Sequence, residues 1–226
     1  MSLMVAEEKG LAEVITAHTF SPDGKMVAIC PNSPEVHIYD CSSGSDPKKW
    51  TKLHTIAEHT SIVSGIDWNT DNQILTASHD RNAYVWTYNA ADNIWKPSLC
   101  MLRINRAATG AVWSPCQKKF AVPSGSKQIA VCNHEASSDW WISKIVRKNH
   151  KSTILTAAFS PNSQLMVTAG TDYKCRIVSV FDKALDAKTG EYDAIFNTPD
   201  LYTFGETLVE YDQVRLVSSL QYSLAL

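Results

Sequence analysis

The sequence predicts an all-β fold, a β-propeller built from four-stranded blades. Two observations predict it: one layout of strands and turns recurs four times in 226 residues, and two landmarks within that layout keep their register. An aromatic residue before the first turn falls at Phe20, Trp68, Trp113 and Phe159, with spacings of 48, 45 and 46. The last strand of each unit ends at Tyr39, Trp86, Cys132 and Val178, with spacings of 47, 46 and 46. A β-sandwich with evenly spaced strands is the alternative, and two landmarks in register make it much less favoured.

Each repeat reads as a strand ending in an aromatic, a turn, a second strand, a second turn and a third strand. The predicted blades lie near residues 15–40, 59–87, 107–133 and 150–179, so residues 1–181 form a partial propeller. A period slightly above ~40–45 residues is typical of WD-type repeats.

Composition excludes several functions. A net charge of −2 argues against a protein whose main task is coating nucleic acid. Six cysteines without a CxxC pair and seven scattered histidines lack metal-ligand spacing, so neither a metal nor a cofactor is expected. We find neither a secretory signal nor an apolar run near the ~20 residues of a membrane span, so the expected location is the cytoplasm.

The second repeat carries a polar set that in WD-type repeats forms a buried hydrogen-bond network. It consists of His59, Asp80, Thr76 or Ser78, and Trp86. The fourth repeat keeps His150 and Asp172 but has Val178 in place of the tryptophan, and the first and third repeats have Ser33 and Ser126 in place of the aspartate. Only the second repeat is therefore expected to hold the complete set.

A hydrolase that uses His59 or His79 with Asp80 is the catalytic alternative. The sequence has no Gly-x-Ser-x-Gly elbow, P-loop or HExxH motif to support it. We therefore expect no catalytic residues and no enzymatic activity.

Several stretches are more specific than a generic repeat. They are Asp80-Arg81-Asn82-Ala83-Tyr84-Val85-Trp86, the run from Leu102 to Thr109 that contains Asn-Arg-Ala-Ala-Thr, Asp139-Trp140-Trp141-Ile142-Ser143-Lys144, and Tyr173-Lys174-Cys175-Arg176. From about Ile15 to Phe181 the chain resembles the WD-repeat subunit (subunit 1) family of the Arp two-three complex, the branched-actin nucleator.

The resemblance implies a seven-bladed WD-repeat propeller, of which about four blades are visible, and a non-catalytic scaffold that supports branched actin filament formation. The implied partners are the other subunits and the actin-related proteins, extending to the actin filament and nucleation-promoting factors, in the cytoplasm and cytoskeleton. The alternative is a general WD-repeat adaptor that recruits peptides or ubiquitin-ligase substrates.

Two groups of residues are candidates for protein binding. Arg103, Asn105 and Arg106 lie in the connection between the second and third repeats, and connections run on the surface. Trp140 and Trp141 are adjacent in a strand and should point to opposite faces, followed by a basic cluster of Lys144, Arg147 and Lys148. The alternatives are a solvated loop or rim, or, for Arg106, a structural replacement of the missing blade histidine.

Residues 182–226 read as a polar loop and a non-repeat tail. Apolar residues alternate from Val214 to Leu226, which indicates either an edge strand over the last blade or the unpacked tail of a truncated product, and we favour the second. Seven blades would need roughly 7 × 45 residues, so the end blades should expose apolar side faces. We expect the isolated chain to be oligomeric or poorly soluble.

Overall fold

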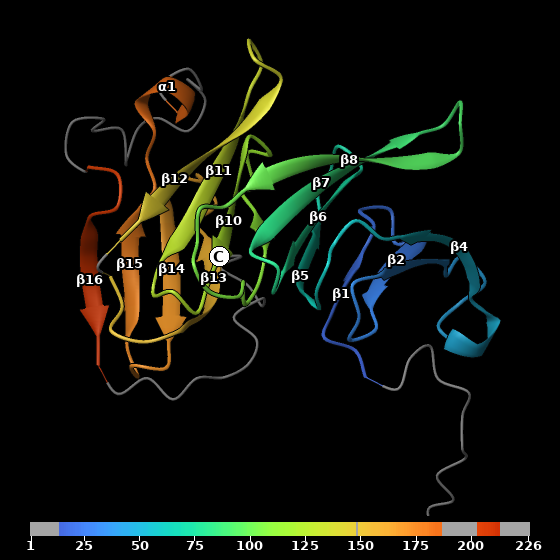
Figure 1. Cartoon of the computed structure of the whole chain (residues 1–226), viewed down its shortest axis with the longest axis horizontal. Coiled ribbons are helices and arrows are strands. Elements are labelled where there is room, and N and C mark those ends of the chain that lie inside the picture. The colour runs from blue at the N-terminus through green and yellow to red at the C-terminus, as the bar shows by residue number, and fades with distance from the viewer. Residues whose placement is uncertain (1–13, 148, 187–202, 213–226) are drawn as a thin grey trace, which may run out of the picture.

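The computed structural model describes residues 14–147, 149–186 and 203–212, and it confirms the all-β prediction. Four antiparallel sheets of four strands each stand side by side in chain order (Figure 1). We number these sheets as blades 1 to 4. None of the helices in the described part of the chain is long and apolar enough to cross a membrane.

Every blade has its strands in sequential order, and short turns join all the strands of blades 2 and 3. Blade 1 contains β1 (Ala17–Phe20), β2 (Met26–Cys30), β3 (Val36–Asp40) and β4 (Thr51–Ile56), with the 3-10 turn η1 (Pro47–Lys49) before β4. Blade 2 contains β5 (Val63–Trp68), β6 (Gln73–Ser78), β7 (Asn82–Asn89) and β8 (Ile94–Met101). Blade 3 contains β9 (Val112–Trp113), β10 (Lys119–Pro123), β11 (Ile129–Glu135) and β12 (Trp140–Val146). Blade 4 contains β13 (Ile154–Phe159), β14 (Leu165–Gly170), β15 (Cys175–Ser179) and β16 (Thr207–Tyr211), with the short helix α1 (Lys183–Asp186) between β15 and β16.

The turns repeat as regularly as the strands. The first turn of each blade contains one residue with positive φ, which is Gly24, Asn72, Gln117 or Ser163. The second turn of blades 2, 3 and 4 places Arg81, Lys127 and Tyr173 in the same region, spaced 46 residues apart. The same backbone geometry recurs although the residue types differ, because the antiparallel strands on either side determine the turn.

The core lies between the blades rather than within one of them. Between blades 1 and 2, Trp68 and Trp95 belong to one buried cluster with Ala28 and Ile38. Between blades 2 and 3, the corresponding cluster joins Leu75 and Val85 to Trp113 and Trp141. Between blades 3 and 4, it joins Ala121 and Val131 to Met166 and Val178. Burial of these faces is what orders the blades relative to one another.

Polar contacts also join consecutive blades. Hydroxyl groups donate across each boundary, from Thr16 to Val63 O (2.6 Å), from Ser64 to Ala108 O (2.7 Å) and from Thr109 to Ile154 O (2.6 Å). At the boundary between blades 2 and 3, the backbone N–H of Trp113 also donates to Asp67 Oδ2 (2.7 Å). Burial raises the pKa of Asp67 to about 6, against the lowering effect of the backbone N–H groups of Trp113 and Trp68.

The fourth strands differ most from the sequence expectation. The predicted blade ranges stop before β4, β8 and β12, and β16 lies inside the 182–226 region that was expected to be loop and tail. β16 pairs with β15 and completes blade 4 as its edge strand. The alternating stretch from Val214 to Leu226 lies outside the described residues.

A buried ion pair holds the segment after β15 against blade 3. Lys119 Nζ donates to Asp186 Oδ2 (2.7 Å) and to Val180 O (3.0 Å), and the lysine side chain is 1% exposed. The backbone N–H of Asp182 donates to Asp186 in turn (2.7 Å). Residues 182–186, the beginning of the predicted polar loop, therefore include the short helix α1 and are held against blade 3 by Asp186.

Candidate protein-interaction site

The polar set of blade 2 forms one continuous hydrogen-bonded chain. Trp86 Nε1 donates to Thr76 Oγ1 (2.9 Å), which lies 2.9 Å from His59 Nε2, and His59 Nδ1 lies 2.8 Å from Asp80 Oδ2. Because the indole can only donate, the threonine hydroxyl is left to donate to Nε2, and Nδ1–H then donates to the carboxylate. Burial lowers the pKa of His59, which keeps the imidazole neutral in this arrangement.

Ser78 has a different place in this network. Its hydroxyl donates to Ser61 O (2.9 Å) and accepts the backbone N–H of Asp80 (3.1 Å), so it shapes the turn. Between the two candidates Thr76 and Ser78, it is therefore Thr76 that contacts both the histidine and the tryptophan.

Blade 4 builds an equivalent network with different residues. His150 Nε2 lies 2.9 Å from Thr168 Oγ1, and Nδ1 lies 3.0 Å from Asp172 Oδ1. Arg176 pairs with Thr168 as Tyr84 pairs with Thr76 in blade 2, and its NH1 lies 3.0 Å from Asp172 Oδ2 and 2.8 Å from His150 Nδ1. Burial alone would raise the pKa of Asp172, but hydrogen bonds from His150, the Lys151 backbone and Arg176 hold it well below its usual value.

Sequence reasoning missed Arg176 and Thr168, although it aligned Val178 correctly with Trp86. Val178 is fully buried in the core between blades 3 and 4. A signal was present for the threonine: Thr168 lies 92 residues after Thr76, which is two repeat periods. The arginine carried no such signal, because an alternating strand residue with a charge reads as solvent-facing.

Neither histidine is placed for chemistry. The side chains of His59 and His150 are 1% and 0% exposed, and both ring nitrogens of each are engaged within the blade. A general base must reach the proton it abstracts from a substrate. The geometry therefore gives these groups a role in holding the turns and strands together.

The structure places the first predicted binding group beside β12, the strand that carries most of the second group. Ser143 Oγ in β12 donates to Leu102 O (3.1 Å), so the connection after β8 runs beside β12. Arg103, Asn105 and Arg106 are exposed in this connection, and Arg147 is exposed at the end of β12. Arg106 also lies against Gly125, in the turn at the same end of blade 3 as Val146. We call the four residues Arg103, Asn105, Arg106 and Arg147 the seam surface.

The remaining candidates are dispersed. Trp140 is 45% exposed and Trp141 is 7% exposed, on opposite faces of β12. Trp140 begins β12, six residues before Val146, which places it about 20 Å from the seam surface. Lys144 pairs with Asp182 and lies 5.9 Å from the ring centre of Phe204, so it is engaged within the chain. Lys148 lies outside the described residues.

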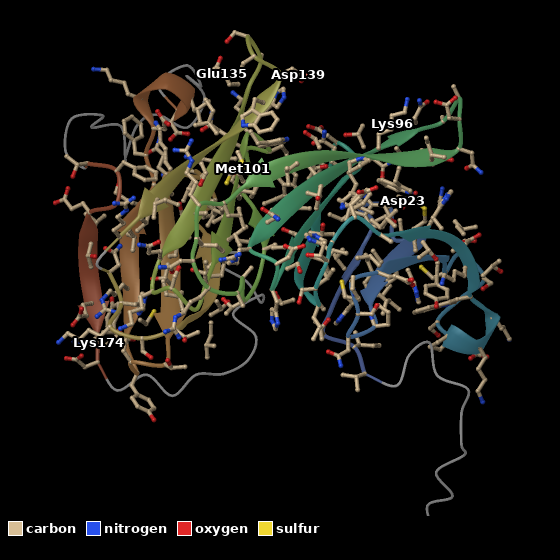
Figure 2. All side chains as sticks on the ribbon, in the orientation of Figure 1. Asp23, Lys96, Met101, Glu135, Asp139 and Lys174 are labelled. Carbon is tan, nitrogen blue, oxygen red and sulfur yellow. The ribbon has the colours of Figure 1, made fainter. Side chains whose placement is uncertain are left out.

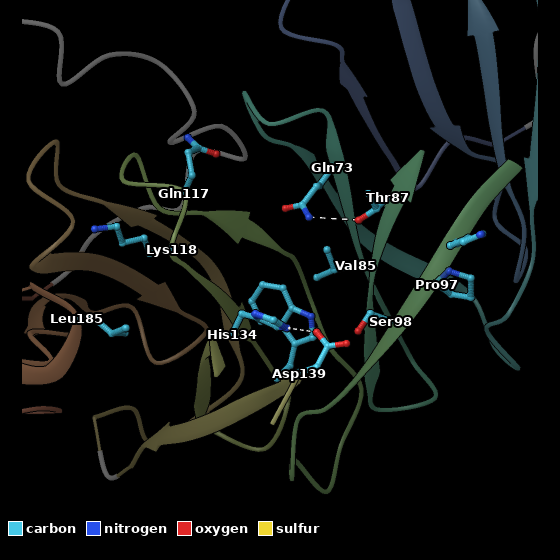
Figure 3. A pocket seen from close by; sticks show the side chains of 12 residues that line it. Gln73, Val85, Thr87, Pro97, Ser98, Gln117, Lys118, His134, Asp139 and Leu185 are labelled. Carbon is cyan, nitrogen blue, oxygen red and sulfur yellow. Dashed lines mark hydrogen bonds and ion pairs between the residues drawn. The ribbon is translucent and has the colours of Figure 1, made fainter. Parts of the chain in front are cut away.

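A cavity of about 540 Å³ opens at the other end of the boundary between blades 2 and 3 (Figure 3). Thr87 and Ser98 line it from blade 2, and His134, Asp139 and Trp141 line it from blade 3. His134 Nε2 lies 3.0 Å from Asp139 Oδ1, and Gln73 Nε2 donates to Thr87 Oγ1 (3.2 Å). These two pairs each join polar groups within one blade.

The charged groups at the blade edges are widely separated. Figure 2 shows Glu135 and Asp139 at the tip of the β11–β12 hairpin, whereas Lys174 lies at the opposite edge of blade 4. Lys174 pairs there with Glu210 and Asp212 of the edge strand region. Within the described ranges, no group of three or more His, Cys, Asp and Glu side chains could hold a metal ion.

The family model described as WD domain, G-beta repeat matches residues 50–87 and 142–179. The first match ends one residue after Trp86, and the second spans β12 to β15, so both end at the third strand of a blade.

Three relatives represent the similarity to known proteins. The chain is 44% identical over 211 residues to actin-related protein 2/3 complex subunit 1A of Arabidopsis thaliana, covering 93% of this chain and 53% of that protein. It is 42% identical over 205 residues to subunit 1A-B of Xenopus laevis, covering 90% and 53%, and 34% identical over 221 residues to subunit 1 of Saccharomyces cerevisiae, covering 97% and 55%. The chain thus spans about half the length of these relatives.

Proposed function

Because this WD-repeat chain is related over most of its length to the subunit 1 proteins of the actin-related protein 2/3 complex, we propose that it is a non-catalytic structural subunit of such a complex. The observation that carries the proposal is the similarity of 34–44% identity over 90–97% of the chain in relatives from a plant, an animal and a yeast. The proposed partners are the other subunits and the actin-related proteins, with the actin filament and nucleation-promoting factors as further contacts, in the cytoplasm and cytoskeleton.

The geometry supports a scaffold. His59 and His150 are enclosed by the blade networks, while the seam surface presents three arginines beside a boundary between two sheets. An arginine fork can meet a carboxylate in two parallel hydrogen bonds, which suits contacts that need a fixed orientation. We propose that the seam surface carries part of the contact with a neighbouring subunit, with the exposed Trp140 and the adjacent cavity at the other end of the same boundary.

Co-purification tests the function. The tagged 226-residue chain is expressed in cells of its own source, and the proteins that copurify are identified by mass spectrometry. Recovery of actin-related proteins with other subunits supports the proposal. Recovery of an unrelated set of peptides or ubiquitin-ligase components would favour the adaptor function instead.

A charge-reversal variant tests the surface. Arg103→Glu with Arg106→Glu should reduce recovery of the same partners, because the exposed cationic forks are replaced by like charges. Lys52→Glu, which reverses an exposed charge on β4 of blade 1, is the matched control and should leave recovery unchanged. Equal losses in both variants would contradict a specific role of the seam surface.

A further inference from the structure

The cavity between blades 2 and 3 lies at a place that side chains fill at the preceding boundary. Between blades 1 and 2, the rings of His54 in β4 and Tyr88 in β7 meet edge to face, with their centres 5.8 Å apart. By strand register, Ser98 is the counterpart of His54 in the next blade. His134 is likewise the counterpart of Tyr88. Both counterparts line the cavity.

Two differences keep this place open between blades 2 and 3. Ser98 has no ring that crosses the boundary, and His134 is held in its own hairpin, where Nε2 lies 3.0 Å from Asp139 Oδ1. Figure 3 shows Ser98 and Pro97 on β8, across from His134 and Asp139. The cavity is therefore a departure from the repeat, and its volume of about 540 Å³ falls within the ~300–1,000 Å³ of small-molecule sites.

The lining offers hydrogen-bond donors that have no acceptor. Trp141 is 7% exposed, and its indole N–H is not enclosed as those of Trp95 and Trp113 are. In the part of the chain that the structure describes, neither this N–H nor the hydroxyl of Ser98 makes a hydrogen bond. Because an indole nitrogen can only donate, a ligand that binds beside Trp141 has to supply the acceptor.

One positive charge of the lining is uncompensated. Lys96 Nζ lies 3.2 Å from Asp92 Oδ2, and the carboxylate of Asp139 is engaged by His134. Among the lining residues that the structure describes, Lys118 is the cation that has no ion-pair partner. A single uncompensated cation suits a ligand with one negative charge rather than several.

We propose that this cavity binds a small organic monocarboxylate, an acid carried on an apolar stem. Its carboxylate accepts hydrogen bonds from the Trp141 indole and the Ser98 hydroxyl, while Lys118 at the rim supplies the opposite charge. Pro97 and Leu185 provide apolar walls for the stem. The inference does not depend on the proposed function, because this chain by itself contributes the whole lining.

The indole N–H signals report such binding directly. The probe is phenylacetate, titrated into the isotope-labelled full chain, whose seven tryptophans each give one indole signal in a two-dimensional nitrogen–proton NMR spectrum. The signal of Trp141, identified by its loss in Trp141→Phe, should move downfield and saturate, because a charge-assisted hydrogen bond forms. Phenylacetamide, which has the same stem without the charge, should bind about tenfold more weakly.

Variants of the lining locate the binding. Lys118→Gln should raise the dissociation constant of phenylacetate about threefold. Lys25→Gln is the matched control, because Lys25 follows the positive-φ residue of the first turn in blade 1 as Lys118 does in blade 3, and it should leave the constant unchanged. Ser98→His combined with His134→Tyr rebuilds the ring pair of the preceding boundary, so it should fill the cavity and abolish the shift.

Circular dichroism shows whether each variant folds, and the comparison of Lys118→Gln with Lys25→Gln decides the question if the filled variant does not. The proposal is overturned if the Trp141 signal stays in place at about 10 mM phenylacetate. Equal affinities for the acid and the amide overturn it as well. So does an unchanged affinity in the folded Ser98→His, His134→Tyr variant, or the same affinity in both lysine variants.

Discussion

The backbones of blades 2 and 3 approach each other closely at Gly65 in β5. A Cβ built on this residue would lie 2.3 Å from the carbonyl carbon of Gly110 and 2.4 Å from the backbone nitrogen of Ala111. Both atoms belong to the backbone that enters blade 3. Gly65→Ala must therefore push one blade away from the other, because neither atom can rotate out of the way.

The size of the effect follows from the required shift. Ordinary contacts begin near 3.4 Å, so the backbone around Gly110 would have to move by about 1 Å. That segment is held by hydrogen bonds from Ser64 Oγ to Ala108 O (2.7 Å) and from Thr109 Oγ1 to Ile154 O (2.6 Å). Overpacking of a tight interior typically costs about 1–3 kcal/mol, and a clash of backbone with backbone belongs at the upper end. We expect Gly65→Ala to lower the free energy of unfolding by about 3 kcal/mol.

Urea denaturation followed by tryptophan fluorescence measures this loss, and a melting temperature lower by about 6–12 °C should accompany it. The matched control is Gly110→Ala on the facing segment, where a Cβ would meet Pro123 Cγ at 3.5 Å, an ordinary contact. It should be neutral or slightly stabilising, because alanine restricts the unfolded chain. Equal midpoints for the two variants would refute the conclusion that the close approach at Gly65 holds the two blades together.

Three further predictions concern the blade networks and turns. Thr76→Val leaves the buried Trp86 N–H without an acceptor and removes the hydroxyl next to His59. The urea midpoint should therefore fall by the equivalent of about 2–4 kcal/mol. An unchanged midpoint would contradict a stabilising role of this network. The folded-state pKa of His59 lies below 6.5, so the unfolded chain takes up the proton first as the pH falls. The free energy of unfolding is therefore highest above pH 6.5 and declines below it. His59→Gln should make this decline between pH 7 and 5 less steep, by at most about 1.4 kcal/mol per pH unit. Tyr173 has φ 59 and is 69% exposed, so Tyr173→Asn should raise the melting temperature by the equivalent of about 0.5–1 kcal/mol, and no increase would show that the turn is not strained.

The inner part of each blade was predictable because its signals are local and repeated. Strands such as β6 and β11 are apolar and β-branched, and the turns between them keep their spacing. The landmark aromatics Phe20, Trp68 and Trp113 therefore revealed the period, and the resemblance to the subunit 1 family is confirmed by relatives at 34–44% identity.

The outer strands were harder to predict for a physical reason. β4 and β8 lie at the edge of their sheets and are largely exposed, so their sequences lack the alternation that indicates a half-buried strand. Their one apolar signal, the series Trp50, Trp95 and Trp141, is visible only by comparing positions 45 and 46 residues apart. Nothing in the sequence pairs Arg176 with His150, or Lys119 with Asp186, because contacts 26 and 67 residues apart depend on the finished fold.

The buried pair of Lys119 and Asp186 has a consequence for dividing this chain into parts. A cut after Phe181 follows the end of the repeats, yet it would remove the carboxylate that pairs with Lys119, a side chain that is 1% exposed in blade 3. Breaking such a pair from one side typically costs about 3–5 kcal/mol, because the remaining charge stays out of water. A fragment that ends at Phe181 would thus destabilise blade 3, although the residues removed belong to blade 4 and the segments after it. A truncated fragment that keeps the stability of blade 3 must therefore extend at least to Asp186.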